Sequence, residues 1–199
     1  MPSSLFERKI ARVRDEMRRR GVAAVVLAEN GRTRYVSGYQ RYYTATYLPF
    51  VHLAVVTLDA GPVLLLPRHI MGAADANQAE RVLEFPLSQE GKIDTLVELL
   101  RELGAAGSRI AIELDFVQYG FLAPLRERLP GAEIVDAAPL MNQVTAIKFP
   151  EEIELIRESA RIVDLGIGAA IEVIRESATE LEVGARSSAA MLEAGAEFI

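Results

Sequence analysis

The sequence predicts an α/β fold: a three-layer α/β/α domain with a mixed sheet, followed by two helices. Three observations lead to this prediction. Short apolar runs typical of strands alternate with segments of helical periodicity as far as residue 144. Two of these strands are separated only by the turn Asp59-Ala60-Gly61-Pro62, which makes part of the sheet antiparallel. After Phe149-Pro150 only helical patterns remain.

The first predicted helix begins after Ser3 or Ser4, either of which can cap it, and it ends at Gly21. Its apolar residues recur at spacings of four, three and four: Phe6, Ile10, Val13 and Met17. The same segment carries seven Lys and Arg residues, interrupted by acidic ones. We interpret these cations as a solvated face whose cationic end complements the helix dipole, with nucleic-acid binding as the alternative.

The other elements of the domain follow from two patterns. A continuous apolar run, expected for a strand covered on both faces, predicts a strand over 23–27. Further short, largely apolar segments predict strands over 51–58, 63–66, 82–85, 109–114 and 133–135. Apolar residues three and four positions apart predict helices over 93–103, 117–129 and 138–144. The polar segment 68–80 also has a helical pattern. Gly104 and Pro130-Gly131 mark the ends of two of these helices.

The last part of the chain predicts a long helix and a shorter one. Pro150 suits a first helical position, and the acidic pair that follows it favours a helix start. One apolar seam then continues at spacings of three and four: Ile153, Ile156, Ala160, Val163, Ile167, Ala170 and Ile174. Thr179 and Glu182 form a capping box for the second helix. We therefore expect one domain over 1–147 and the start of another over 148–199, ending within an unfinished element.

Composition excludes several classes of function. The 199 residues are 50% hydrophobic and 25% charged, carry a formal net charge of −6 and contain no Cys. Disulfides, thiolate metal sites and cysteine nucleophiles are therefore excluded. The negative charge disfavours nucleic acid as the main partner. No apolar run approaches the roughly 18 residues of a membrane span, and no signal-peptide pattern opens the chain. We expect a cytoplasmic protein without membrane contact.

Residues that could perform chemistry are few. Gly166 and Gly168 lie inside a predicted helix, where small residues indicate a helix crossing and not a phosphate-binding loop. Glu113 and Asp115 flank a strand end. Paired carboxylates can serve acid–base or metal chemistry, but acids at a strand end are more often turn or cap residues, and we favour that interpretation. No catalytic residue is assigned.

The two histidines, His52 and His69, are seventeen residues apart on different predicted elements. This spacing lacks the periodicity of metal ligands on one helix, so we expect structural or partly solvated roles. No metal ligand is assigned.

The segment 35–47 holds five of the six tyrosines together with Arg41, and Arg32 and Arg34 directly precede it. Tyr and Arg are enriched at contact surfaces because both combine a large area with a hydrogen-bonding end. This Tyr/Arg segment is the strongest binding candidate in the sequence. A well-packed loop with satisfied phenols is the alternative interpretation.

Three stretches of this sequence resemble the creatinase, prolidase and aminopeptidase P family. Asn30–Tyr39 (NGRTRYVSGY) is similar to the pattern Asn-x-x-Tyr-Leu-(Ser/Thr)-Gly-(Phe/Tyr), with two extra residues after the Asn. Ile147–Arg157 (IKFPEEIELIR) resembles the junction between the family's amino-terminal and catalytic domains. The helix that opens at Thr179–Val183 and leads to Glu193–Glu197 resembles the second helix of that catalytic domain.

The resemblance implies an amino-terminal α/β domain followed by a pita-bread catalytic domain. The family's metal site uses two Asp, one His and two Glu, usually with two divalent ions such as Mn, Co or Zn. All five ligands would lie beyond Ile199, since 150–199 contains one Asp and no His. We therefore expect no metal, cofactor or catalytic site in this chain and an inactive chain on its own.

The resemblance also implies partners. Family members are commonly dimers, in which the amino-terminal domain of one subunit reaches the active site of its neighbour. On that basis Tyr39, Arg41 and Tyr43 are the candidate substrate-binding residues. The substrate of the parent protein would be a peptide or another small C–N compound, cleaved by metal-bound hydroxide. The alternative hypothesis is a stand-alone, non-catalytic interaction module that binds through segment 35–47.

Overall fold

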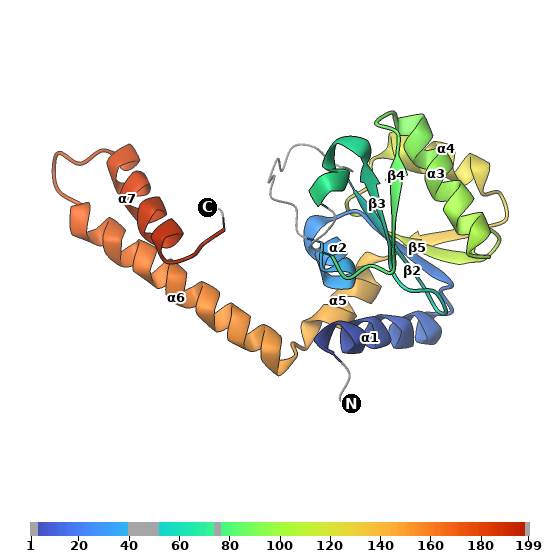
Figure 1. The fold of residues 1–199 in the computed structure, drawn as a ribbon, viewed down its shortest axis with the longest axis horizontal. Coiled ribbons are helices and arrows are strands. Elements are labelled where there is room, and N and C mark those ends of the chain that lie inside the picture. The colour runs from blue at the N-terminus through green and yellow to red at the C-terminus, as the bar shows by residue number, and fades with distance from the viewer. Residues whose placement is uncertain (1–3, 40–51, 74–76, 198–199) are drawn as a thin grey trace. The chain divides into compact units, whose positions relative to one another are not determined.

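A computed structural model of the protein describes residues 4–39, 52–73 and 77–197. The chain divides into two compact units, Met1–Ile147 and Lys148–Ile199, which are described separately below. Figure 1 shows the sheet and helices of the first unit and the two helices of the second.

The first unit is built on a six-stranded sheet with the strand order β4-β3-β2-β1-β5-β6. The strands are β1 (Ala24–Leu27), β2 (Leu53–Thr57), β3 (Val63–Pro67), β4 (Arg81–Phe85), β5 (Arg109–Ile112) and β6 (Glu133–Asp136). Strand β2 runs antiparallel to both of its neighbours, and every other pairing is parallel. The predicted hairpin and mixed sheet are confirmed. The carboxyl ends of the five parallel strands therefore lie at one edge of the sheet.

Helices cover both faces of this sheet (Figure 1). They are α1 (Leu5–Arg20), α2 (Asn30–Ser37), α3 (Gln89–Glu102), α4 (Tyr119–Arg128) and α5 (Ala138–Ala146). Alternate residues of β1 enter different cores: Val25 and Leu27 pack with α1, α2 and α5, whereas Ala24 and Val26 pack with α3 and α4. This period of two explains why the strand is apolar throughout. The predicted three-layer fold is confirmed.

Helix α1 begins and ends at the residues that its sequence predicts. Ser4 Oγ accepts the Glu7 N–H at 3.1 Å, while Glu7 Oε2 accepts the Ser4 N–H at 2.7 Å, which completes a capping box. Gly21 ends the helix in the left-handed region at φ 63°. Arg14 does not lie on a purely solvated face, because it donates to the carbonyls of Thr57 at 3.0 Å and Ala60 at 2.5 Å. The cationic face of α1 thus also fastens the β2–β3 turn.

The prediction of a helix over 68–80 is wrong for the second half of this segment. Residues 68–73 form a short 3-10 helix, η1 (Arg68–Ala73), but 77–79 are not helical. Gln78 N–H instead donates to the Ser37 carbonyl at 2.6 Å, and Glu80 N–H donates to the Pro62 carbonyl at 2.9 Å. Hydrogen bonds to distant segments replace the local ones that a helix would need.

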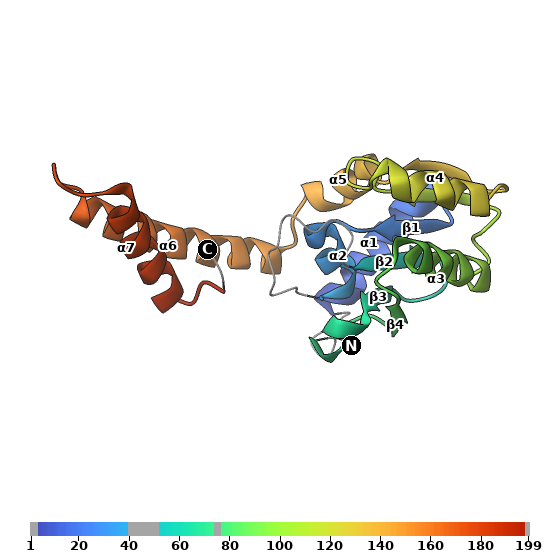
Figure 2. The same cartoon turned by 90° about the horizontal axis from the view of Figure 1, so that it is seen from above.

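The second unit consists of α6 (Pro150–Val173) and α7 (Glu180–Glu193), which lie side by side (Figures 1 and 2). Thr179 and Glu182 form the predicted capping box. The two helices cross at Gly166, the one buried residue of α6, beside Met191 and Ser187 of α7. The interpretation of Gly166 as a helix-crossing residue is confirmed. No helix in the described parts of the chain is long and apolar enough to cross a membrane.

The apolar seam predicted for α6 is continuous, but it is not buried by α7. Helix α7 covers the face that contains Gly166, whereas Ile156, Ile167 and Ile174 are 52%, 52% and 65% exposed. The uncovered residues of the seam and its flank form what we call the α6 stripe: Ile153, Ile156, Val163, Ile167, Ile171 and Ile174. The seam therefore stays uncovered within this unit, because α7 packs on the face of α6 that contains Gly166.

Candidate functional site

The carboxyl edge of the sheet collects the polar residues of the first unit. Glu29, Glu113 and Asp136 stand at or just beyond the ends of β1, β5 and β6. His52 directly precedes β2, which runs the opposite way and so begins at the same edge. In open α/β sheets, ligands bind outside the carboxyl ends of the strands, where successive connections leave to opposite faces. Helices α2 and α4, which follow β1 and β5, lie on opposite faces. This edge is the candidate functional site.

Tyr39 stands at this edge immediately after α2. Its side chain is 3% exposed and packs against Leu64 and Leu66. Its ring meets the His52 imidazole edge to face, with the ring centroids 5.5 Å apart. Tyr39 therefore presents its side chain to the interior. Of the other candidate substrate-binding residues, Arg41 and Tyr43 lie outside the described residues, as does most of segment 35–47.

The end of α2 holds Tyr39 in place. Gly38 closes the helix in the left-handed conformation at φ 68°. Ser37 Oγ donates to the Thr33 carbonyl at 2.8 Å and accepts the Tyr39 N–H at 3.1 Å. One buried hydroxyl thus connects the last turn of the helix to the residue that follows it. His52 is 2% exposed, in keeping with a structural role, whereas His69 is exposed on η1.

A charged cluster holds the start of α2. Arg32 Nη1 donates to Glu113 Oε1 at 3.1 Å, and its guanidinium also forms a two-pronged pair with Asp115 at 3.0–3.1 Å. Glu113 is fully buried, and its Oε2 accepts the N–H groups of Ala28 at 2.5 Å and Glu29 at 2.7 Å. The prediction of a turn residue at Glu113 is confirmed, because its carbonyl accepts the N–H groups of Phe116 at 3.0 Å and Val117 at 2.8 Å, whereas the N-cap of α2 is Glu29. Sequence reasoning missed Arg32 as the partner of Glu113.

Burial and pairing set the electrostatics of this cluster. Burial raises the pKa of Glu113 above its ordinary value, although its hydrogen bonds with Ala28, Glu29 and Arg32 act in the opposite direction. The hydrogen bond from Arg32 to Asp115, together with the charge of Glu113, raises the pKa of Arg32. Arg32 is therefore charged at every accessible pH. The cluster is fully paired, which suits a structural ion network and not an acid–base pair.

The raised pKa of Glu113 predicts how stability depends on pH. The folded protein binds a proton at Glu113 more readily than the unfolded chain does. The contribution of Glu113 to stability is thus complete below the ordinary carboxyl pKa of 4.5 and is lost as pH rises through the raised value. We expect wild type to gain unfolding free energy relative to Glu113→Gln as pH falls from 7 toward 4.5. Urea unfolding at each pH measures this, and the opposite slope would contradict the raised pKa.

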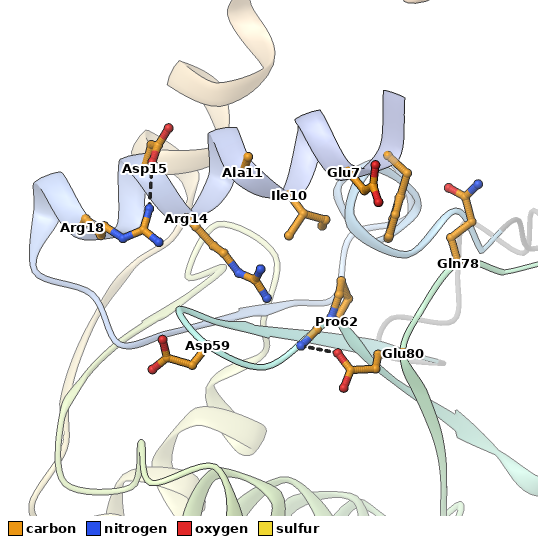
Figure 3. Close-up of a pocket in the computed structure, with 12 residues that line it drawn as sticks. Glu7, Ile10, Ala11, Arg14, Asp15, Arg18, Asp59, Pro62, Gln78 and Glu80 are labelled. Carbon is orange, nitrogen blue, oxygen red and sulfur yellow. Dashed lines mark hydrogen bonds and ion pairs between the residues drawn. The ribbon is translucent and has the colours of Figure 1, made fainter. Parts of the chain in front are cut away.

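A separate cavity of about 440 Å³ lies between α1 and the β2–β3 turn (Figure 3). Its apolar lining includes Phe6, Ile10 and Pro62. Three of its four lining carboxylates are already engaged: Glu7 belongs to the α1 capping box, Asp15 pairs with Arg18 at 2.8 Å, and Glu80 accepts the Gly61 N–H at 2.6 Å (Figure 3). Arg14, which crosses the cavity, is already committed to backbone carbonyls. The cavity therefore offers no organised polar site for a ligand.

No metal site is formed within the described residues, where no three His, Asp or Glu side chains are grouped to hold an ion. The neighbouring carboxylates Glu113 and Asp115 at the candidate edge are both paired with Arg32. A divalent metal would have to compete with that guanidinium for the same oxygens. The described part of the chain thus does not fit the metal site that the family resemblance implies.

The sheet order, the two helix layers and the polar carboxyl edge define a mixed three-layer α/β domain. The model of the Creatinase/Prolidase N-terminal domain family matches residues 9–147. The chain belongs to this family. The matched region ends at the last residue of the first compact unit.

Curated relatives extend the match into the second unit. An uncharacterized hydrolase/peptidase of Sinorhizobium fredii is 28% identical over 191 residues, covering 92% of this chain and 48% of the relative. A creatinase of a Bacillus species is 26% identical over 193 residues, covering 93% of this chain and 44% of the relative. The chain thus spans about half the length of the curated relatives it matches.

A solved structure shares the fold. The prolidase from Pyrococcus horikoshii matches with a TM-score of 0.73 and 23% identity, over 96% of this chain and 50% of that chain. At this identity the likeness shows the fold alone.

Proposed function

We propose that this chain is the amino-terminal portion of a metal-dependent hydrolase of the creatinase and prolidase type. The observation that carries the proposal is the pattern of coverage: relatives named for hydrolase activity match almost the whole chain over about half of their own length. In this proposal residues 1–147 are the amino-terminal domain, and 148–199 are the linker and first helices of the catalytic domain.

The α6 stripe supports this proposal. Its six large apolar side chains, five on α6 and the sixth at the capping residue Ile174, are between 39% and 65% exposed. Contiguous exposed apolar surface of this kind marks an interface or a missing layer. The catalytic half of a longer polypeptide would supply that layer. If the chain were a stand-alone interaction module, another partner would have to cover the α6 stripe.

This chain would contribute to dimer formation and to the rim of the substrate pocket. We propose that the parent forms a dimer in the cytoplasm and acts on a peptide or a small C–N compound such as creatine. Tyr39, Arg41 and Tyr43 would shape the rim of the substrate pocket. Tyr39 would act from its buried position beside His52 and not by direct contact through an exposed ring. The two divalent metal ions would be held by residues outside this chain.

An activity assay tests the proposal. The 199-residue chain and the longer polypeptide that contains it are each assayed against an Xaa-Pro dipeptide and creatine. The assays are run after chelation and again after Mn²⁺, Co²⁺ or Zn²⁺ is restored. We expect metal-dependent turnover by the longer polypeptide and none by the 199-residue chain. Turnover by the short chain, or none by the longer one with any metal, would overturn the proposal and favour an interaction module.

A further inference from the structure

Helix α2 has little apolar anchorage. It is only eight residues long, and its buried residues are Thr33, Val36 and Ser37. A helix of this length is marginal in water on its own, so contacts with the rest of the domain must hold it in place. Near the start of the helix, Asn30 is exposed and Arg32 is half-buried. Val36 and the half-buried Tyr35 pack against the core on one face of the sheet, and polar contacts add to this packing in fixing the placement of α2.

Those contacts join α2 to three separate segments. Arg32 is 18% exposed and reaches Glu113 and Asp115 after β5, with Asn142 Oδ1 of α5 at 3.5 Å from its Nη2. Glu113 in turn holds the peptide groups just before α2. A two-pronged guanidinium–carboxylate pair fixes orientation as well as distance. The start of α2 is therefore fixed in both position and direction.

The opposite end of α2 leads directly to the aromatic pair. Ser37 connects the last turn to Tyr39, and the Ser37 carbonyl accepts the Gln78 N–H. Tyr39 packs on β3 and contacts His52 at the start of β2. Tyr39 is itself one of the proposed substrate-binding residues, so its placement beside His52 bears on the proposed function.

We propose that Arg32, with Glu113 and Asp115, is a positioning residue. It sets the placement of α2 and, through α2, the contact between Tyr39 and His52. The link to the substrate rests on the proposed function. The coupling between the charged cluster and the aromatic pair does not, and it can be measured in this chain alone.

Asp115→Asn tests the coupling because it removes a charge with little change of shape at a side chain that is 45% exposed. The chain has only two histidines, so the NMR signals of both imidazoles can be assigned without ambiguity. We expect the His52 ring signals to shift or broaden, because the ring current of Tyr39 depends on its placement. The His69 signals should stay unchanged. Circular dichroism confirms that the variant is folded.

Two further variants make the result decisive. Arg32→Lys keeps the charge but loses the two-pronged geometry, and should also move the His52 signals. Arg81→Gln is the matched control, because it breaks the exposed Arg81–Glu102 pair away from this edge and should move neither histidine. Unchanged His52 signals in both Asp115→Asn and Arg32→Lys would overturn the coupling.

The link between the charged cluster and substrate binding is tested in the longer polypeptide. Asp115→Asn should raise KM for an Xaa-Pro dipeptide on the order of tenfold, with a smaller change in kcat, because substrate placement and not the reacting group is altered. Arg81→Gln should change neither constant. An unchanged KM in an active Asp115→Asn enzyme would overturn the positioning role and leave the proposed function standing. Absence of turnover in wild type would overturn the proposed function and leave the coupling result standing.

Discussion

Gly166→Leu should separate α7 from α6. A Cβ at residue 166 would lie 2.6 Å from Met191 Cγ and 3.1 Å from Ser187 Oγ, so a whole leucine side chain cannot fit at the crossing. Overpacking of this kind costs typically about 1–3 kcal/mol, which is a large fraction of what two packed helices can supply. We expect the amides of residues 180–193 to lose protection in hydrogen exchange measured by mass spectrometry, while the sheet keeps its protection.

Gly168→Leu is the matched control for this prediction. Gly168 lies two residues along the same helix, and a Cβ at residue 168 would have no other atom within 4 Å. Replacing an exposed helical Gly should strengthen the helix by up to about 1 kcal/mol. Equal protection of α7 in the Gly166→Leu and Gly168→Leu variants would contradict the observed crossing.

The 199-residue chain should self-associate through the α6 stripe. The stripe exposes six large apolar side chains, and burying each isoleucine against a partner contributes roughly 1.5–3 kcal/mol. Replacing Ile156, Ile167 and Ile174 by Gln should therefore weaken self-association by several orders of magnitude. Sedimentation velocity over a range of concentrations measures the change.

Leu87→Gln provides a control for the stripe. Leu87 is 71% exposed but lies in the first unit, away from α6 in sequence. Its substitution should leave self-association unchanged. A wild-type chain that sediments as a monomer at high concentration would contradict the interpretation of the stripe as an uncovered interface.

Local signals explain which elements can be predicted. The capping boxes at Ser4 and Thr179 and the left-handed Gly21 are each determined by a few neighbouring residues, so sequence alone identifies them. The conformation of 77–80 escapes prediction because its backbone bonds reach Ser37 and Pro62, and no local pattern encodes such partners. The same reason applies to the α6 stripe. Periodicity identifies an apolar face but does not say what covers it.

The candidate site can be predicted only in part. The place of Glu113 at a strand end predicts a turn or cap residue, but its partner Arg32 lies 81 residues away along the chain. Only the parallel pairing of β1 with β5 brings the two together. The family resemblance singles out Tyr39, and the structure places its side chain in the interior beside His52. Neither the resemblance nor the composition of segment 35–47 predicts the direction of this ring.

The central claim is that this chain is the amino-terminal portion of a metal-dependent hydrolase. Reading the coding DNA beyond the codon for Ile199 tests it most directly. The account predicts an open frame that supplies two Asp, one His and two Glu in the order of the family's metal ligands. A frame that stops at Ile199, or one that continues without those ligands, would contradict it.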